Sequence, residues 1–164
     1  MFIRRIFIES ICAVLMTALV GVAQSPTETR VDVSIALKVA GQTYAFNGKG
    51  ECTYAPAAYV FGTQARQWKV QGNNAQGSAS LTFWRLAAGS VDMFSFYAST
   101  GGKSYVVNTV KTSGGGKVEG FGKATFTPAG SGGTFTIDAT AAKGGTITGT
   151  MKCSAFSAVV DEGG

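Results

Sequence analysis

Hydrophobic and polar residues alternate over most of this chain. The clearest run spans residues 31–39, where valine, isoleucine and leucine side chains take every second position. Period-two alternation predicts a β-strand with one buried face. Similar runs follow about every 8–12 residues, with glycine-rich turns between them. We therefore predict an all-β domain, an antiparallel β-sandwich of about 8–10 strands, with a closed up-and-down β-barrel as the alternative.

A single pairing register satisfies both faces in each of two hairpins. In residues 80–97, pairing Leu86 with Val91 aligns apolar residues on one face and ends that face in an opposite-charge pair. The predicted pairs are Leu81–Phe96, Phe83–Phe94 and Arg85–Asp92. In residues 121–140, pairing Thr127 with Thr134 predicts Thr125–Thr136 and Lys123–Asp138 on one face, and Phe126–Phe135 and Ala124–Ile137 on the other.

Glycine and asparagine mark the expected turns. Asn47-Gly48-Lys49-Gly50 predicts a tight turn, because glycine adopts positive φ without strain. Residues 72–77 predict an exposed loop, and Pro56 is expected to interrupt a strand. The last strand should direct Ile147, Met151 and Cys153 into the core.

The first 23 residues have the pattern of a secretory signal peptide. Arg4 and Arg5 precede an apolar run from Ile11 to Val20, and small residues before position 24 predict cleavage after Ala23. The apolar run is too short to span a bilayer of about 30 Å as a stable anchor, which favours a cleaved signal peptide. The alternative is that the segment stays uncleaved and acts as an N-terminal anchor. We expect residues 24–164 to form one domain exported from a bacterium, secreted or held in the periplasm or cell envelope. Residues 160–164 should be a frayed tail, and no transmembrane segment is expected after cleavage.

Cys52 and Cys153 are the cysteines beyond the signal peptide. In an oxidising compartment they predict one disulfide, which closes a loop of about 100 residues and stabilises the fold by about 4–5 kcal/mol in the chain-entropy model. The net charge is +5 at pH 7, and the lysines and arginines are spread singly along the chain. Without a basic cluster we expect no nucleic-acid partner.

The residue types needed for common catalytic sites are missing or scattered. The chain has no histidine, so a nucleophilic triad lacks its base, and two cysteines alone make half of a zinc site. The acidic residues are scattered, which disfavours calcium. We predict no enzyme activity, no metal and no cofactor. A hydrolase using Glu51 or Glu119 would need a cleft that brings two carboxylates within about 5–10 Å.

The second face of the 80–97 hairpin is the candidate binding site. Its side chains, at positions between those of the core ladder, include Trp84, Leu86, Val91, Met93 and Tyr97. A solvent-facing sheet is normally polar. This face is therefore either covered by another part of the chain or a contact surface for a ligand or partner.

Four short runs point to a known family: Gly48 to Cys52, Gly122 to Ala124, Phe135 to Thr140 and Ile147 to Cys153. They resemble the mycobacterial 19-kDa lipoprotein antigen family. The resemblance implies an exported β-rich domain with one disulfide between an early strand and the last strand, and an envelope or surface role. The chain lacks that family's cysteine directly after the signal peptide, so lipid anchoring is not implied.

Together these features predict an exported, non-catalytic binding or envelope-interaction protein. Its partner would be a protein, a glycan or a lipid, bound through the face that carries Trp84, Met93 and Tyr97. A carrier of a small apolar ligand inside a barrel is the alternative. An inhibitor that presents the 72–77 loop is a variant of the first hypothesis.

Overall fold

The computed structural model describes residues 30–87 and 92–159, and this part of the chain is all-β. It contains no helix, and so none long and apolar enough to cross a membrane. The predicted signal peptide, Val91 and the predicted tail lie outside the described residues. The strands are β1 (Val31–Val39), β2 (Gln42–Val60), β3 (Thr63–Asn74), β4 (Gly77–Leu86), β5 (Met93–Thr100), β6 (Lys103–Thr109), β7 (Val118–Glu119), β8 (Phe121–Ala129), β9 (Gly132–Thr140), β10 (Thr146–Cys153) and β11 (Ser157–Ala158).

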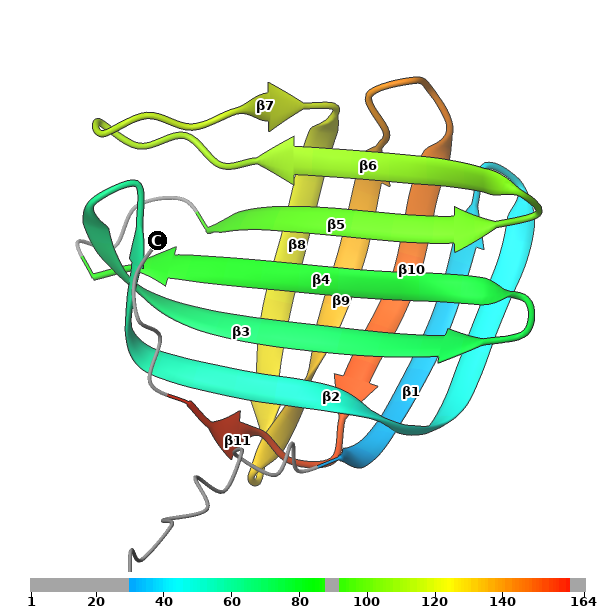
Figure 1. Ribbon diagram of the computed structural model, residues 1–164, viewed down its shortest axis with the longest axis horizontal. Coiled ribbons are helices and arrows are strands. Elements are labelled where there is room, and N and C mark those ends of the chain that lie inside the picture. The colour runs from blue at the N-terminus through cyan, green and yellow to red at the C-terminus, as the bar shows by residue number, and fades with distance from the viewer. Residues whose placement is uncertain (1–29, 88–91, 160–164) are drawn as a thin grey trace, which may run out of the picture.

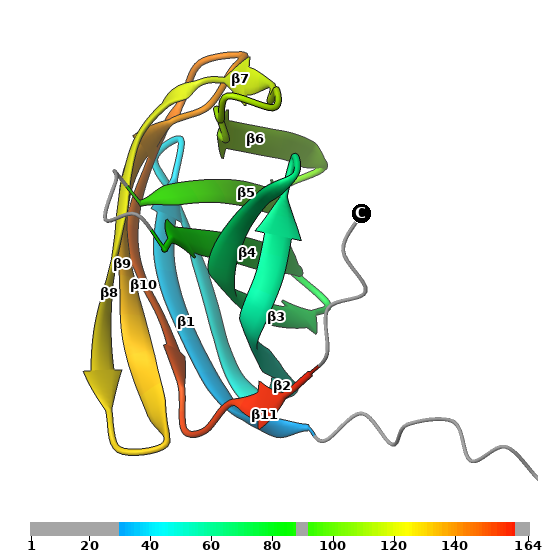
Figure 2. The same cartoon turned by 90° about the vertical axis from the view of Figure 1, so that its left-hand side faces the viewer.

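The strands form one curled sheet in the order β7-β6-β5-β4-β3-β2-β1-β10-β9-β8, and β11 adds to β2 in parallel. The two ends of this order, β7 and β8, are separated only by Gly120, whose φ of 74° lets the chain turn between them. In Figure 1, β1 and β8–β10 run across β2–β6, and Figure 2 shows the two layers edge on. The predicted all-β fold with a disulfide is confirmed, and the curled sheet fits both the sandwich and the barrel description.

β2 joins the two layers because it is long and bent. Residues 42–50 pair with β1, and residues 51–60 pair with β3. The predicted turn at Asn47–Gly50 is therefore wrong, since these residues continue the strand and neither glycine has positive φ. Close packing is the reason for glycine here: a Cβ on Gly50 would lie 2.9 Å from a methyl carbon of Val33.

Both predicted hairpin registers are confirmed. In β4 and β5 the pairs are Leu81–Phe96 and Phe83–Phe94, and in β8 and β9 they are Lys123–Asp138, Ala124–Ile137, Thr125–Thr136, Phe126–Phe135 and Thr127–Thr134. The inward positions of these strands are almost completely buried, except Phe126, which is partly buried. One register satisfied both faces in each hairpin, and a slip by one residue would have exchanged core and solvent faces.

The predicted loop at residues 72–77 is wrong. β3 continues to Asn74 and β4 begins at Gly77, so the connection is a two-residue turn. The side-chain oxygen of Asn74 accepts a hydrogen bond from the backbone N–H of Gln76 at 2.9 Å. This local bond lets a short turn replace the longer loop.

Aromatic rings fill the space between the layers. Trp68 on β3 and Phe83 on β4 meet Phe126 on β8 and Phe135 on β9, with ring centroids 4.7–6.4 Å apart. Phe83 and Phe135 are fully buried. Burying one such side chain contributes about 1.5–3 kcal/mol, so this cluster is a main source of adhesion between the layers.

The predicted disulfide joins Cys52 on β2 to Cys153 on β10, with Cα atoms 6.2 Å apart and both residues buried. Cys153 is the last residue of the β1–β10 ladder, where it pairs with Val33. Cys52 lies just beyond the point where β2 leaves β1. The bond therefore holds the corner at which the sheet bends from one layer into the other.

Candidate functional site

The candidate face is the outward side of β4–β6, opposite the layer interface. Trp84 pairs with Met93, and Ser80 pairs with Tyr97, as the predicted register requires. We call this surface the outer platform. Its outward-facing residues are Ser78, Ser80, Thr82 and Trp84 on β4, Met93, Ser95, Tyr97 and Ser99 on β5, and Ser104, Val106 and Asn108 on β6.

The structure divides the predicted site residues into a covered group and an exposed one. Met93 is only 5% exposed and belongs to a small second core, against which Trp84 and Leu86 are partly buried. Tyr97 remains 40% exposed, with its hydroxyl 3.2 Å from the Ser104 Oγ. Val91 lies outside the described residues. Both interpretations offered by the sequence therefore apply, each to a different part of the face.

The cover over Met93 comes from two segments distant in sequence. Val60 and Ala65, at the end of the β2–β3 hairpin, and Val110, just after β6, complete the second core. The backbone N–H of Lys111 points to the Met93 Sδ at 3.4 Å. In Figure 1 the end of this hairpin and the segment after β6 lie on the same side of the molecule. Sequence reasoning missed these residues, and the apolar Val110 directly after a strand was the available signal.

Gln67 fixes the orientation of the Trp84 ring. The indole N–H donates a hydrogen bond to the Gln67 Oε1 at 2.7 Å, and Gln67 is only 5% exposed. The two residues also face each other across the β3–β4 ladder. A buried polar side chain that satisfies an indole N–H keeps the ring in one position on the surface.

The predicted Arg85–Asp92 pair is formed. The guanidinium donates two hydrogen bonds to the carboxylate, at 2.8 and 2.7 Å, and its carbon lies 5.7 Å from the centre of the Phe83 ring. The pKa of Arg85 is raised, mainly by the hydrogen bond to Asp92, with a smaller opposing effect of burial and a supporting one from the carboxylate charge. The pair keeps both charges at one end of the layer interface.

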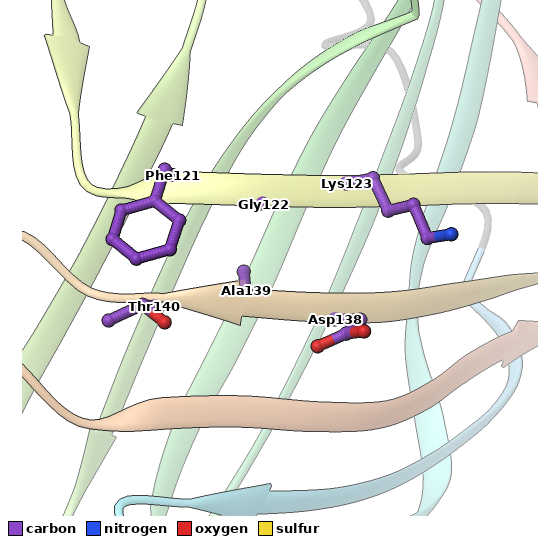
Figure 3. A pocket seen from close by; sticks show the side chains of 6 residues that line it. All are labelled: Phe121, Gly122, Lys123, Asp138, Ala139 and Thr140. Atoms are coloured by element: carbon purple, nitrogen blue, oxygen red, sulfur yellow. The ribbon is translucent and has the colours of Figure 1, made fainter.

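A shallow pocket of about 430 Å³ lies on β8 and β9. Figure 3 shows the Phe121 ring and Thr140 at one end, Lys123 and Asp138 at the other, and Gly122 with Ala139 between them. Ala139 is the one lining residue that is buried, and the Phe121 ring is 68% exposed. With no buried polar group directed into it, this hollow lacks the features of a specific small-molecule site.

The carboxylates considered for hydrolysis are not gathered into one group. Glu119 pairs with Lys117 at 2.7 Å, Asp92 pairs with Arg85, and Glu51 faces Gln71 on the neighbouring strand. In residues 30–87 and 92–159, no three histidine, cysteine, aspartate or glutamate residues lie close enough to hold a metal ion.

The fold and this surface define the chain as an all-β domain with one disulfide and an uncharged outer platform. Comparisons with family models, curated proteins and solved structures found no match. The resemblance to the mycobacterial 19-kDa antigen family therefore rests on the four short runs alone.

Proposed function

We propose that this protein is an exported, non-catalytic binding protein of the bacterial envelope, and that its outer platform binds a neutral glycan. The observation that carries the proposal is the absence of charge on the platform. None of its outward positions on β4–β6 is a lysine, arginine, aspartate or glutamate, whereas about a quarter to a third of a typical soluble surface is charged. Charged side chains border the platform on the neighbouring strands, where Lys69 of β3 lies opposite Thr82 and Glu119 of β7 lies opposite Asn108. Such a face suits a ligand without charge.

The side chains of the platform match the chemistry of a sugar. Serine, threonine and asparagine supply hydroxyl and amide groups that both donate and accept hydrogen bonds. Tyr97 and the partly exposed Trp84 offer flat apolar rings on which the C–H face of a sugar can stack. The backbone positions of Trp84 and Tyr97 lie four residues apart along the strand direction, on adjacent strands, which is about 13–14 Å. A ligand that contacts both would be an oligosaccharide longer than one unit.

The export part of the proposal is supported by two features. The N-terminal segment has the charge and hydropathy pattern of a signal peptide. The buried Cys52–Cys153 disulfide is of the kind that persists in oxidising compartments. The carrier hypothesis gains no support of this kind, since aromatic rings occupy the space between the layers. The hydrolase hypothesis gains none either, since Glu119 is engaged by Lys117.

Trp84 provides a direct assay. In a Trp68→Phe variant the remaining tryptophan is on the platform, so its emission reports on that surface. We expect cellohexaose, chitohexaose, mannohexaose or maltohexaose to shift or enhance this emission in a saturable way. Tyr97→Ala should weaken that binding by about fivefold or more, because one stacked ring contributes about 1 kcal/mol or more.

Tyr59→Ala is the matched control, since Tyr59 is 48% exposed but lies on the β2–β3 hairpin and not on the platform. It should leave the affinity unchanged. If none of the four sugars alters Trp84 emission, or if Tyr59→Ala and Tyr97→Ala weaken binding equally, the platform is not a glycan site.

A further inference from the structure

The turn between β2 and β3 holds a phenylalanine in an unfavourable backbone conformation. Val60 pairs with Thr63, so Phe61 and Gly62 form a two-residue turn, with φ of 44° and 72°. Positive φ at both central positions is the type I′ geometry, for which Asn-Gly is the preferred sequence. A bulky residue in this region carries strain of about 1–3 kcal/mol, so Phe61 is not there for turn stability.

The Phe61 ring is displayed on a glycine support. The side chain is 48% exposed, and Tyr59, two residues earlier, is equally exposed. A Cβ added to Gly115 would lie 3.5 Å from the Phe61 Cδ1, and one added to Gly114 would collide with the Phe61 carbonyl oxygen. Glycine in the segment after β6 therefore allows this segment to lie directly against the turn while the ring stays accessible.

Two cations lie close to this turn along the chain: Arg66 is on β3, the strand that leaves the turn, and Lys111 belongs to the segment that Gly114 and Gly115 bring against Phe61. Arg66 and Lys111 are exposed, and within the described residues neither forms an ion pair. Nearby carboxylates are already engaged, Asp92 by Arg85 and Glu119 by Lys117. Exposed aromatic rings beside unneutralised cations complement the interface of an anionic bilayer, where rings enter the headgroup level and cations meet phosphates.

We propose that this end of the molecule, with Phe61 and Tyr59 inserted and Lys111 and Arg66 at the headgroups, docks on anionic lipid membranes. We name it the loop end. It adjoins the covered part of the outer platform, where Val60 and Val110 pack on Met93, but its exposed residues are different ones, and the proposal does not depend on glycan binding.

The turn allows a test in which stability and binding move in opposite directions. Phe61→Asn creates Asn-Gly, so it should raise the urea midpoint of unfolding. Because it also removes the ring, it should weaken binding to equimolar phosphatidylglycerol–phosphatidylcholine vesicles by at least fivefold, the effect expected when the exposed half of one ring can no longer be inserted. Ala40→Asn is the matched control, because Ala40 and Gly41 form another turn of this kind that also has a non-glycine residue at its first position, with φ of 48° and 86°. It should also stabilise the fold but leave vesicle binding unchanged.

Lys111→Gln should weaken vesicle binding about fivefold, the effect expected for one cation at an anionic surface, and added salt should do the same. Binding measured by co-sedimentation of the purified, disulfide-bonded protein should be weak on phosphatidylcholine alone. Equal binding to both vesicle types, or equal binding by Phe61→Asn and Ala40→Asn, would overturn the proposal. The proposal would also be overturned if the wild type self-associates in the absence of lipid and Phe61→Asn abolishes this association, because the ring would then bind a second copy of the chain.

Discussion

Removing the disulfide should have the largest effect on stability of any change that leaves the core side chains in place. Cys52 and Cys153 are 101 residues apart in sequence. The chain-entropy model gives about 5 kcal/mol for a loop of that length. Small domains have a total unfolding free energy of about 5–15 kcal/mol, so the double variant Cys52→Ala/Cys153→Ala should retain a marginally stable fold or none.

The measurement is urea unfolding followed by far-ultraviolet circular dichroism. With a slope of about 2 kcal/mol per molar urea, the midpoint should fall by about 2–3 M. Reduction of the wild type should lower its midpoint to a similar extent, and the same reductant should leave the double variant unchanged. A wild type that is fully reduced by thiol titration yet unfolds at its original midpoint would refute the reasoning, because the strand ladders alone would then hold the corner.

Three further predictions concern the interior and its edge. The Tyr44 hydroxyl is buried, 3.2 Å from the Gly72 carbonyl oxygen, and burial raises its pKa. The folded state therefore favours the neutral phenol, so this group's contribution to stability should hold below about pH 10, the tyrosine pKa in the unfolded state, and fall as the pH rises above it. Tyr44→Phe should abolish that alkaline loss and lower the free energy of unfolding near neutrality by about 1 kcal/mol. A double-mutant cycle on Arg85 and Asp92 should give a coupling below about 1 kcal/mol, because the arginine side chain is 40% exposed, and a value above about 2 kcal/mol would contradict this. Phe135→Ala should lower the unfolding free energy by about 4 kcal/mol in thermal or urea unfolding, and a loss below about 1 kcal/mol would show that its ring contacts are not important.

The sequence was informative wherever local alternation and pairing constrained each other. The β8–β9 register followed from placing Phe126 and Phe135 inside while Lys123 faced Asp138 outside. The turn predicted from the sequence at Asn47–Gly50 is wrong, because glycine occurs both in turns and where strands approach closely. Gly50 serves the second purpose, and only the packing of Val33 against it distinguishes the two.

The candidate site shows the same division. The alternation of β4 and β5 placed Trp84, Met93 and Tyr97 on one face correctly. Their accessibility depends on Val60 and Val110, which come from other parts of the chain. These two residues pack on Met93 and bury it, whereas Tyr97 stays exposed. Period-two patterning specifies a face of a strand, but it carries no information on what later covers that face.

The pairing of β1 with β10 sets the order in which the molecule can be completed. Val33, near the start of the described chain, lies opposite Cys153, so β1 lacks its second neighbour until β10 has been synthesised. Contacts between such distant segments slow folding, and an unpaired strand edge favours aggregation in the meantime. Cys52 likewise stays without its partner thiol until the last long strand is present. A nascent or C-terminally truncated chain of this protein should therefore depend on chaperones that shield β1, and oxidation of the thiols should come as a late step that fixes an already assembled sheet.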